Sequence, residues 1–154
     1  NLEAKRDWGY APEYVEGIWR MLQHDIPDDF VLATNESHSI KEFVDASFLY
    51  FGINLDWDLN DNGYKGIVNK LDLNDLDYLK DSDKHLIEKF FNKMNRKVVI
   101  KTNKIHERPS EVNTLLGDYS KAKDKLGWEP KVRFNELVRI MLKADFIKRK
   151  QKTK

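Results

Sequence analysis

The 154-residue sequence contains no cysteine, which excludes a disulfide framework, a thiol nucleophile and a zinc site built on thiolates. It also has no apolar run long enough to cross a membrane and no signal-peptide pattern. Lysine and arginine (27) nearly balance aspartate and glutamate (26), so no global field favours nucleic acid. We therefore expect a cytoplasmic protein that binds neither membranes nor nucleic acid, in which any anion binding is local.

Glycine is scarce, and none of the seven glycines forms the Gly-x-Gly-x-x-Gly turn that brings a backbone close to a pyrophosphate. We therefore do not expect this chain to hold a dinucleotide cofactor by itself. The four histidines lack the spacing of a metal site. A calcium-loop pattern begins at Asp58 but carries Asn69 where a bidentate Glu is required, so a solvated acidic loop is expected there.

Apolar periodicity and turn signals predict an α/β fold with too few strands for a complete doubly wound sheet. The apolar face of the first predicted helix, which carries Val15, Ile18, Trp19 and Leu22, is expected to pack in a core. The basic tail, residues 147–154, is expected to be an irregular, solvated end. Helices are predicted over 11–24, 40–51, 81–94, 119–126 and 134–142, and strands over 30–34 and 97–101. Gly127 is expected to end the helix over 119–126.

The most informative stretch is residues 106–112, which read His-Glu-Arg-Pro-Ser-Glu-Val. Pro109 makes Arg108 extended and stiffens the loop that presents it. A guanidinium binds phosphate in a bidentate manner, and Glu111 is suited to a ribose diol. The alternative for a single loop arginine is simple solvation, but a second basic pair, Lys5 and Arg6, lies in an Asp-Trp-Gly context near the N-terminus.

Four segments carry a family resemblance in series. Residues 1–9 read Asn-Leu-Glu-Ala-Lys-Arg-Asp-Trp-Gly, residues 31–34 read Val-Leu-Ala-Thr, residues 108–112 read Arg-Pro-Ser-Glu-Val, and residues 126–130 read Leu-Gly-Trp-Glu-Pro. In order and approximate spacing they resemble the GDP-mannose 4,6-dehydratases, a group within the extended short-chain dehydrogenase family. The resemblance covers residues 1–52 and 97–146.

The resemblance implies that residues 1–146 are the C-terminal, substrate-binding portion of a longer Rossmann-type enzyme whose N-terminal dinucleotide-binding half lies outside this chain. The whole enzyme would be a lyase of GDP-fucose biosynthesis that converts GDP-mannose to GDP-4-keto-6-deoxymannose and water. Its NADP would be bound mainly by the N-terminal half. That half and further copies of the enzyme, in a homo-oligomer, are the implied partners, and this portion alone is expected to be inactive.

Site roles follow from the same resemblance. Arg6 and Arg108 would clamp the diphosphate, Lys5 would approach the guanosine end, and Glu111 would accept hydrogen bonds from the ribose hydroxyls. No catalytic residue is expected in this chain. Tyr119 and Lys123 have the Tyr-x-x-x-Lys spacing of a short-chain dehydrogenase pair, but they follow the arginine loop and match a peripheral helix instead.

Residues 53–96 depart from the family pattern as a longer, acidic, insertion-like segment. Two other functions stay open at this point. A related nucleotide-sugar epimerase or dehydratase would share the arginine clamp and prefer another base. A non-catalytic module would bind a nucleotide sugar without turnover.

Overall fold

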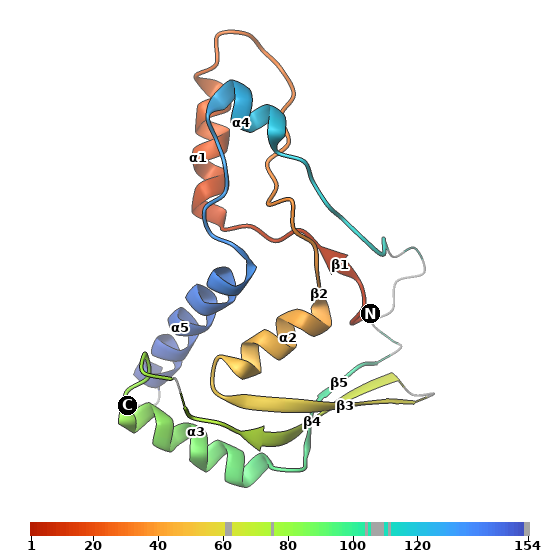
Figure 1. Ribbon diagram of the computed structural model, residues 1–154, viewed down its shortest axis with the longest axis vertical. Coiled ribbons are helices and arrows are strands. Elements are labelled where there is room, and N and C mark those ends of the chain that lie inside the picture. Colours follow the sequence, from red (N-terminus) through yellow and green to blue (C-terminus); the bar gives the residue numbers. More distant parts are fainter. Residues whose placement is uncertain (61–62, 75, 104, 106–109, 111, 153–154) are drawn as a thin grey trace. The chain divides into compact units, whose positions relative to one another are not determined.

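The computed structural model describes residues 1–60, 63–74, 76–103, 105, 110 and 112–152. The strands are β1 (Lys5–Arg6), β2 (His38–Ser39), β3 (Ile53–Asn60), β4 (Gly63–Leu71) and β5 (Val98–Lys101). The helices are α1 (Ala11–Leu22), α2 (Ile40–Leu49), α3 (Asp81–Met94), α4 (Ser120–Leu126) and α5 (Phe134–Lys152). Helices and strands are mixed along the chain, with β3 directly followed by β4 and α4 directly followed by α5 (Figure 1).

The chain divides into two compact units. Unit 1 comprises Asn1–Leu2 and Lys41–Glu111, and unit 2 comprises Glu3–Ile40 and Val112–Lys154. Each unit is therefore discontinuous, because it consists of two segments that are separated in the sequence. The predicted site residues Lys5 and Arg6 belong to unit 2.

Unit 1 contains an antiparallel three-stranded sheet in the order β3-β4-β5. Its core consists of apolar side chains from the sheet, from α3 and from the segment between them: Ile53, Val68, Leu76, Leu79 and Ile87. The indole Nε1 of Trp57 on β3 donates to Asp45 Oδ1 at 2.7 Å and so attaches α2 to the sheet. Val68 is fully buried, as expected for the central strand β4.

Unit 2 is built around the indole of Trp128, which is 2% exposed. Its Nε1 donates to the backbone oxygen of Glu13 on α1 at 2.7 Å. The rings of Tyr14 and Tyr119 meet it edge-on, at centroid distances of 5.7 and 6.1 Å. Helix α4 ends at Gly127 in the left-handed conformation, φ 61°, which is the predicted glycine stop.

Most predicted elements are present within a few residues, but two predictions were wrong. Residues 30–34 form no strand, because the backbone amide of Thr34 donates to the Asp7 carboxylate instead of to a strand. The expected acidic loop at Asp58 is part of a β-hairpin, in which Asp58 pairs with Lys65 across β3 and β4. Asp61 and Asn62 of that pattern lie outside the described residues.

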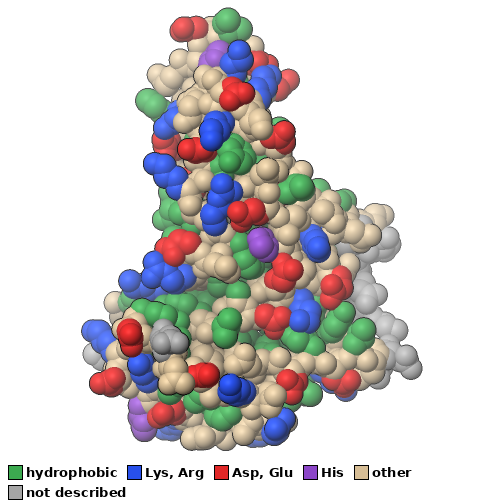
Figure 2. Space-filling view, viewed as in Figure 1, with side chains coloured by type: hydrophobic (Ala, Val, Ile, Leu, Met, Phe, Trp, Pro, Cys, Tyr) green, Lys and Arg blue, Asp and Glu red, His purple; other side chains and the backbone are tan. Residues whose placement is uncertain are grey.

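The predicted irregular tail also differs from the structure, because α5 continues to Lys152. The basic residues at 148–152 are therefore helical. Among the described residues, no helix combines the length and the apolar character needed to span a membrane. Basic and acidic side chains are interspersed over the face seen in Figure 2, in line with their near balance in the sequence.

Helix α1 departs from the expectation that its apolar face packs in a core. Val15 is 65% exposed, Ile18 52%, Trp19 60% and Leu22 77%. The buried residue of this helix is Gly17, on the opposite face. A Cβ atom at Gly17 would lie 2.6 Å from Leu32 Cδ1, so the close packing of α1 depends on this glycine.

Candidate functional site

Strand β1 is held on both sides by extended backbone. Toward β2 it pairs antiparallel, Lys5 with Ser39 and Arg6 with His38. On its other side the amide of Lys5 donates to the oxygen of Asn113 at 2.7 Å, and the amide of Leu115 donates to the oxygen of Lys5 at 3.1 Å. Residues near the N-terminus and residues just after position 111 therefore lie side by side.

The Arg6 side chain makes a second connection between these segments. Its Nη1 donates to the backbone oxygen of Val112 at 2.7 Å and to that of Lys5 at 2.7 Å. A guanidinium has five N–H donors in a planar fork. Arg6 thus fixes the position of the chain that leaves the Arg-Pro loop.

Arg108 and Glu111, the other two predicted site residues, lie outside the described residues. The structure describes Val112 and the three residues after it, which contact β1 as above. Lys5 and Arg6 are consequently next to the segment that begins one residue after Glu111. The structure thus places Lys5 and Arg6 beside Val112–Leu115, and the shared ligand site of Arg108 and Glu111 stays a prediction.

Asp7 organises the same region, although it was not predicted as a site residue. Its Oδ1 accepts from the amide of Thr34 at 2.8 Å and from the Thr34 hydroxyl at 2.6 Å. Its Oδ2 accepts from the amides of Asn35 at 3.1 Å and Gly117 at 3.2 Å. The available sequence signal was its position between Arg6 and Trp8, but the four donors come from residues far away in the sequence.

A stack of three rings lies beside β1 and β2. The centroid of the Phe134 ring lies 3.9 Å from that of the His38 ring, and the two ring planes are 11° apart. On the Trp8 side the centroid distance is 5.8 Å and the interplanar angle is 18°. Glu36 lies 3.7 Å from His38 Nε2 and 3.4 Å from Arg133 Nη1. His38 is therefore part of the packing beside Arg6, and no sequence pattern had assigned it a role.

Tyr14, on α1, has a strongly shifted pKa. Partial burial, followed by the negative charges of Asp7 and Glu13, raises the pKa of Tyr14 to about 12. Its phenol is therefore protonated at neutral pH. Its ring meets the Trp128 ring edge-on, so Tyr14 acts as a packing residue.

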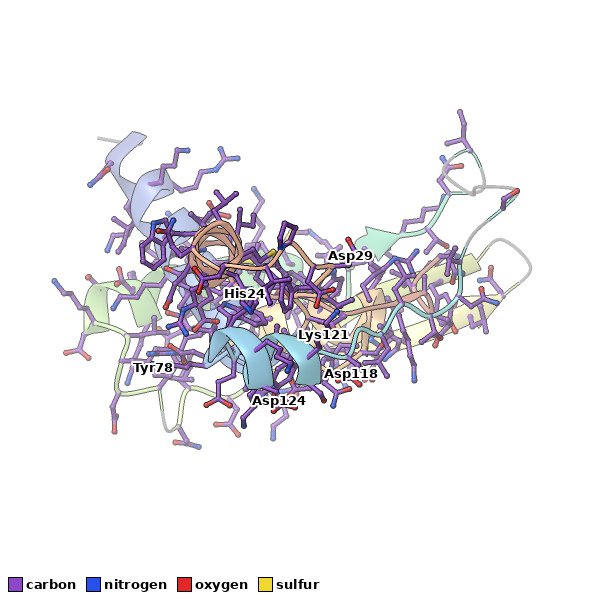
Figure 3. All side chains as sticks on the ribbon, turned by 90° about the horizontal axis from the view of Figure 1, so that it is seen from above. His24, Asp29, Tyr78, Asp118, Lys121 and Asp124 are labelled. Atoms are coloured by element: carbon purple, nitrogen blue, oxygen red, sulfur yellow. The ribbon has the colours of Figure 1, made fainter. Side chains whose placement is uncertain are left out.

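The Tyr-x-x-x-Lys pair has structural contacts in unit 2. The Tyr119 ring meets Trp128 edge-on, and a hydrogen bond with Tyr119 is the main cause that raises the pKa of Arg133. Lys123 Nζ lies 2.7 Å from Glu129 Oε2. Two residues earlier on α4, Lys121 Nζ lies 2.6 Å from Asp28 Oδ1, next to Asp29 (Figure 3).

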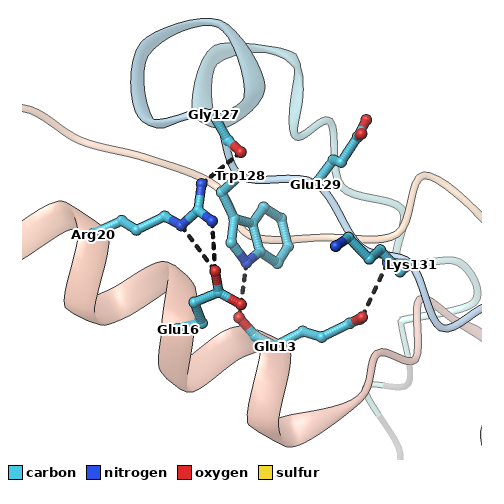
Figure 4. Close-up of a pocket in the computed structure, with 7 residues that line it drawn as sticks. All are labelled: Glu13, Glu16, Arg20, Gly127, Trp128, Glu129 and Lys131. Carbon is cyan, nitrogen blue, oxygen red and sulfur yellow. Dashed lines mark hydrogen bonds and ion pairs between the residues drawn. The ribbon is translucent and has the colours of Figure 1, made fainter.

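A shallow cavity of about 260 Å³ lies between α1 and the segment after α4 (Figure 4). Its polar groups bind one another. Arg20 donates through Nη1 to the Gly127 oxygen at 2.6 Å and through Nε to Glu16 at 3.1 Å, and Glu13 accepts from the Lys131 amide at 3.1 Å. The Arg20 and Glu13 contacts join α1 to the following segment, so we assign the cavity a packing role.

Within the described part of the chain, no three His, Asp or Glu side chains are grouped so that they could hold a metal ion. A dinucleotide fits poorly as well, because the sequence offers no glycine-rich turn between a strand and a helix. Among the described residues, the feature that suits an anionic ligand is the basic pair Lys5 and Arg6 on β1.

The fold of the chain is similar to part of a known structure. The structure of RMD from Pseudomonas aeruginosa complexed with NADPH is similar, with a TM-score of 0.54 and 12% sequence identity. The match covers 93% of this chain and 33% of that one. The predicted α/β class is confirmed, and the chain has the fold of a part of that larger protein.

The family follows from sequence. The family model for GDP-mannose 4,6 dehydratase matches residues 1–141, and the chain belongs to this family. It is 42% identical over 145 residues to the GDP-mannose 4,6 dehydratase of Homo sapiens, covering 94% of this chain and 32% of the relative. The Vibrio cholerae relative is 38% identical over the same length, with 94% and 35% covered. The chain thus spans about a third of the length of these curated relatives.

Proposed function

We propose that this chain is the GDP-sugar-binding portion of a GDP-mannose 4,6-dehydratase, corresponding to residues 1–146, with the basic segment 147–154 at its end. The complete enzyme is a cytoplasmic lyase that converts GDP-mannose to GDP-4-keto-6-deoxymannose and water, a step toward GDP-fucose. It works as a homo-oligomer. Residues 53–96, the hairpin and helix of unit 1, are an insertion-like addition to the binding portion.

NADP supplies the hydride chemistry of the complete enzyme, and the part of the family sequence that this chain does not cover holds it. The lack of a glycine-rich phosphate turn here supports this division. The contribution of this chain is to bind and orient the nucleotide sugar. Orientation lowers a barrier because it replaces a chance encounter with a fixed geometry.

The ligand roles follow from charge and position. Arg6 and Arg108 hold the diphosphate, Lys5 lies toward the guanosine, and Glu111 accepts from the ribose hydroxyls. The observation that carries this proposal is the hydrogen bond from Arg6 Nη1 to the Val112 oxygen, which keeps the chain following the Arg-Pro loop beside Lys5 and Arg6. Two arginines from separate segments can then approach the two phosphates of one ligand.

The test is calorimetric titration of the chain with GDP-mannose, with UDP-glucose as the control ligand. Wild type should bind GDP-mannose selectively, and Arg108→Ala should weaken binding by about 10-fold or more, the equivalent of one charge-assisted hydrogen bond. Arg108→Lys should also weaken it, because an ammonium cannot form the bidentate pair.

Arg139→Ala is the matched control, since Arg139 pairs with Glu136 on α5 and should leave affinity unchanged. Equal affinity for the two nucleotide sugars would contradict specificity for GDP-mannose. Equal affinity of wild type and Arg108→Ala would contradict the clamp.

A further inference from the structure

Helix α1 has two faces of opposite character, and the polar one faces the body of unit 2. Glu13, Glu16 and Arg20 point toward the Trp128 segment (Figure 4). Arg20 donates to the oxygens of Leu126 at 3.0 Å and Gly127 at 2.6 Å, and Gly17 permits the close approach. These contacts account for how α1 is attached to α4 and the residues after it.

The opposite face is apolar. Val15, Ile18, Trp19 and Leu22 recur at helical spacing and form what we call the outer stripe. All four are more than half exposed. A contiguous apolar stripe that includes a tryptophan is typical of an interface and unusual for a solvated helix face.

We infer that the outer stripe docks against the portion of the dehydratase polypeptide that this chain does not cover. The inference rests on the proposed function, because it assumes that the chain works with the rest of a family enzyme. The matched relatives contain about twice as much further sequence, since the chain spans 32% of one and 35% of another. The occupant is therefore a protein surface with an apolar patch, belonging to the same enzyme.

The size of the stripe argues against a second copy of the chain as its occupant. Its four side chains offer on the order of a few hundred Å² of apolar surface. A stable contact between separate chains needs about 800 Å² on each partner. A contact inside one enzyme can be smaller, because covalent linkage or other contacts already hold the two parts together.

The inference is tested in a chimera in which this chain replaces the 145 matched residues of the Vibrio cholerae relative. Trp19→Ser and Leu22→Gln remove apolar surface with little change in helix propensity. Each should lower the melting temperature of the chimera by about 5 °C or more. The same substitutions should shift the melting temperature of the 154-residue chain by less than about 2 °C, since the stripe is exposed there.

Leu86→Gln is the matched control, because Leu86 is an exposed leucine on α3 outside the stripe. It should leave the melting temperature of both proteins unchanged. Sedimentation of the 154-residue chain as a dimer that Trp19→Ser dissociates would assign the stripe to a second copy and overturn the inference. Destabilisation of the monomeric 154-residue chain by the stripe variants would show that the chain itself covers the stripe, with the same consequence.

Equal melting of variant and wild-type chimeras also overturns the inference, as does a wild-type chimera that fails to fold where the unaltered relative folds. The melting readout is independent of the nucleotide sugar. A chimera that melts as expected but does not bind GDP-mannose would overturn the proposed function and leave the docking surface standing. A chimera that binds GDP-mannose but whose melting temperature is unchanged by the stripe variants would overturn the docking surface and leave the proposed function standing.

Discussion

At the scale of single residues, the Asp7 carboxylate joins three separate stretches of unit 2. It follows β1 directly, and its two oxygens accept four hydrogen bonds from Thr34, Asn35 and Gly117. Thr34 is 1% exposed, so its amide and hydroxyl have no access to bulk water. Asp7 thereby positions the strand that carries Lys5 and Arg6.

Asp7→Ala should lower the free energy of unfolding by about 3 kcal/mol, because it leaves buried donors without a partner. Asp7→Asn should cost less, since an amide keeps one acceptor oxygen. Urea unfolding measures both values, and Asp29→Ala, in an exposed loop, serves as the control. A loss of under 0.5 kcal/mol (roughly the effect of a neutral surface change) for Asp7→Ala would contradict this role.

Tyr14 predicts a sensitivity to alkaline pH. Its pKa is 10.0 for the unperturbed phenol and about 12 in the fold. Between these values the unfolded chain releases the proton while the folded chain retains it, so stability is complete below pH 10 and falls as pH rises toward 12. The loss should be on the order of 1 kcal/mol after allowance for partial exposure.

The comparison of wild type with Tyr14→Phe isolates this effect. Phenylalanine cannot titrate, so the difference in unfolding free energy between the two proteins should shrink or reverse between pH 9 and pH 12 (roughly one unit below the usual tyrosine pKa to two above it). Lysines and the other tyrosines titrate in both proteins and cancel. A constant difference across this range would show that the Tyr14 phenol titrates normally.

At the scale of helices and strands, an element could be predicted from sequence where its own apolar spacing and end residues define it. Gly127 ends α4 as predicted because only a residue tolerant of positive φ fits there. Helices α2 and α3 and strand β5 were likewise predicted close to their observed bounds. In each case the apolar spacing and the flanking turn residues indicate the same bounds for the element.

The misplaced elements depend on distant partners. Residues 30–34 have the composition of a buried strand, yet the Thr34 amide is bound by Asp7, 27 residues away. The hairpin at Asp58 was missed because its aspartates resemble a loop, although the pairing of Trp57 with Gly66 places β3 against the central strand β4. Strand propensity reflects such neighbours more than the residues themselves.

The candidate site was predictable in part. A basic pair at 5–6 and the loop 106–112 were identified from sequence, and the structure places β1 beside Val112–Leu115. The supporting residues Asp7, His38 and Phe134 were not identified. Their roles arise from contacts between segments up to 110 residues apart, which no local pattern encodes.

At the scale of the whole molecule, each unit has a hydrophobic core of its own. Val68 is central to unit 1, with Ile53 and Ile87 around it. In unit 2, Val138 on α5 and Trp128 are both 2% exposed. Because each core is composed of residues from its own unit, we expect the two units to unfold as separate cooperative regions.

Val68→Ala and Val138→Ala form a matched pair for this expectation. Each removes the same buried groups and should cost its own unit about 1–3 kcal/mol. Hydrogen exchange should accelerate across β3, β4 and β5 in the first variant and across α1, α4 and α5 in the second. Acceleration of both sets of elements by either substitution would contradict this expectation and would mean that the two units share one unfolding transition.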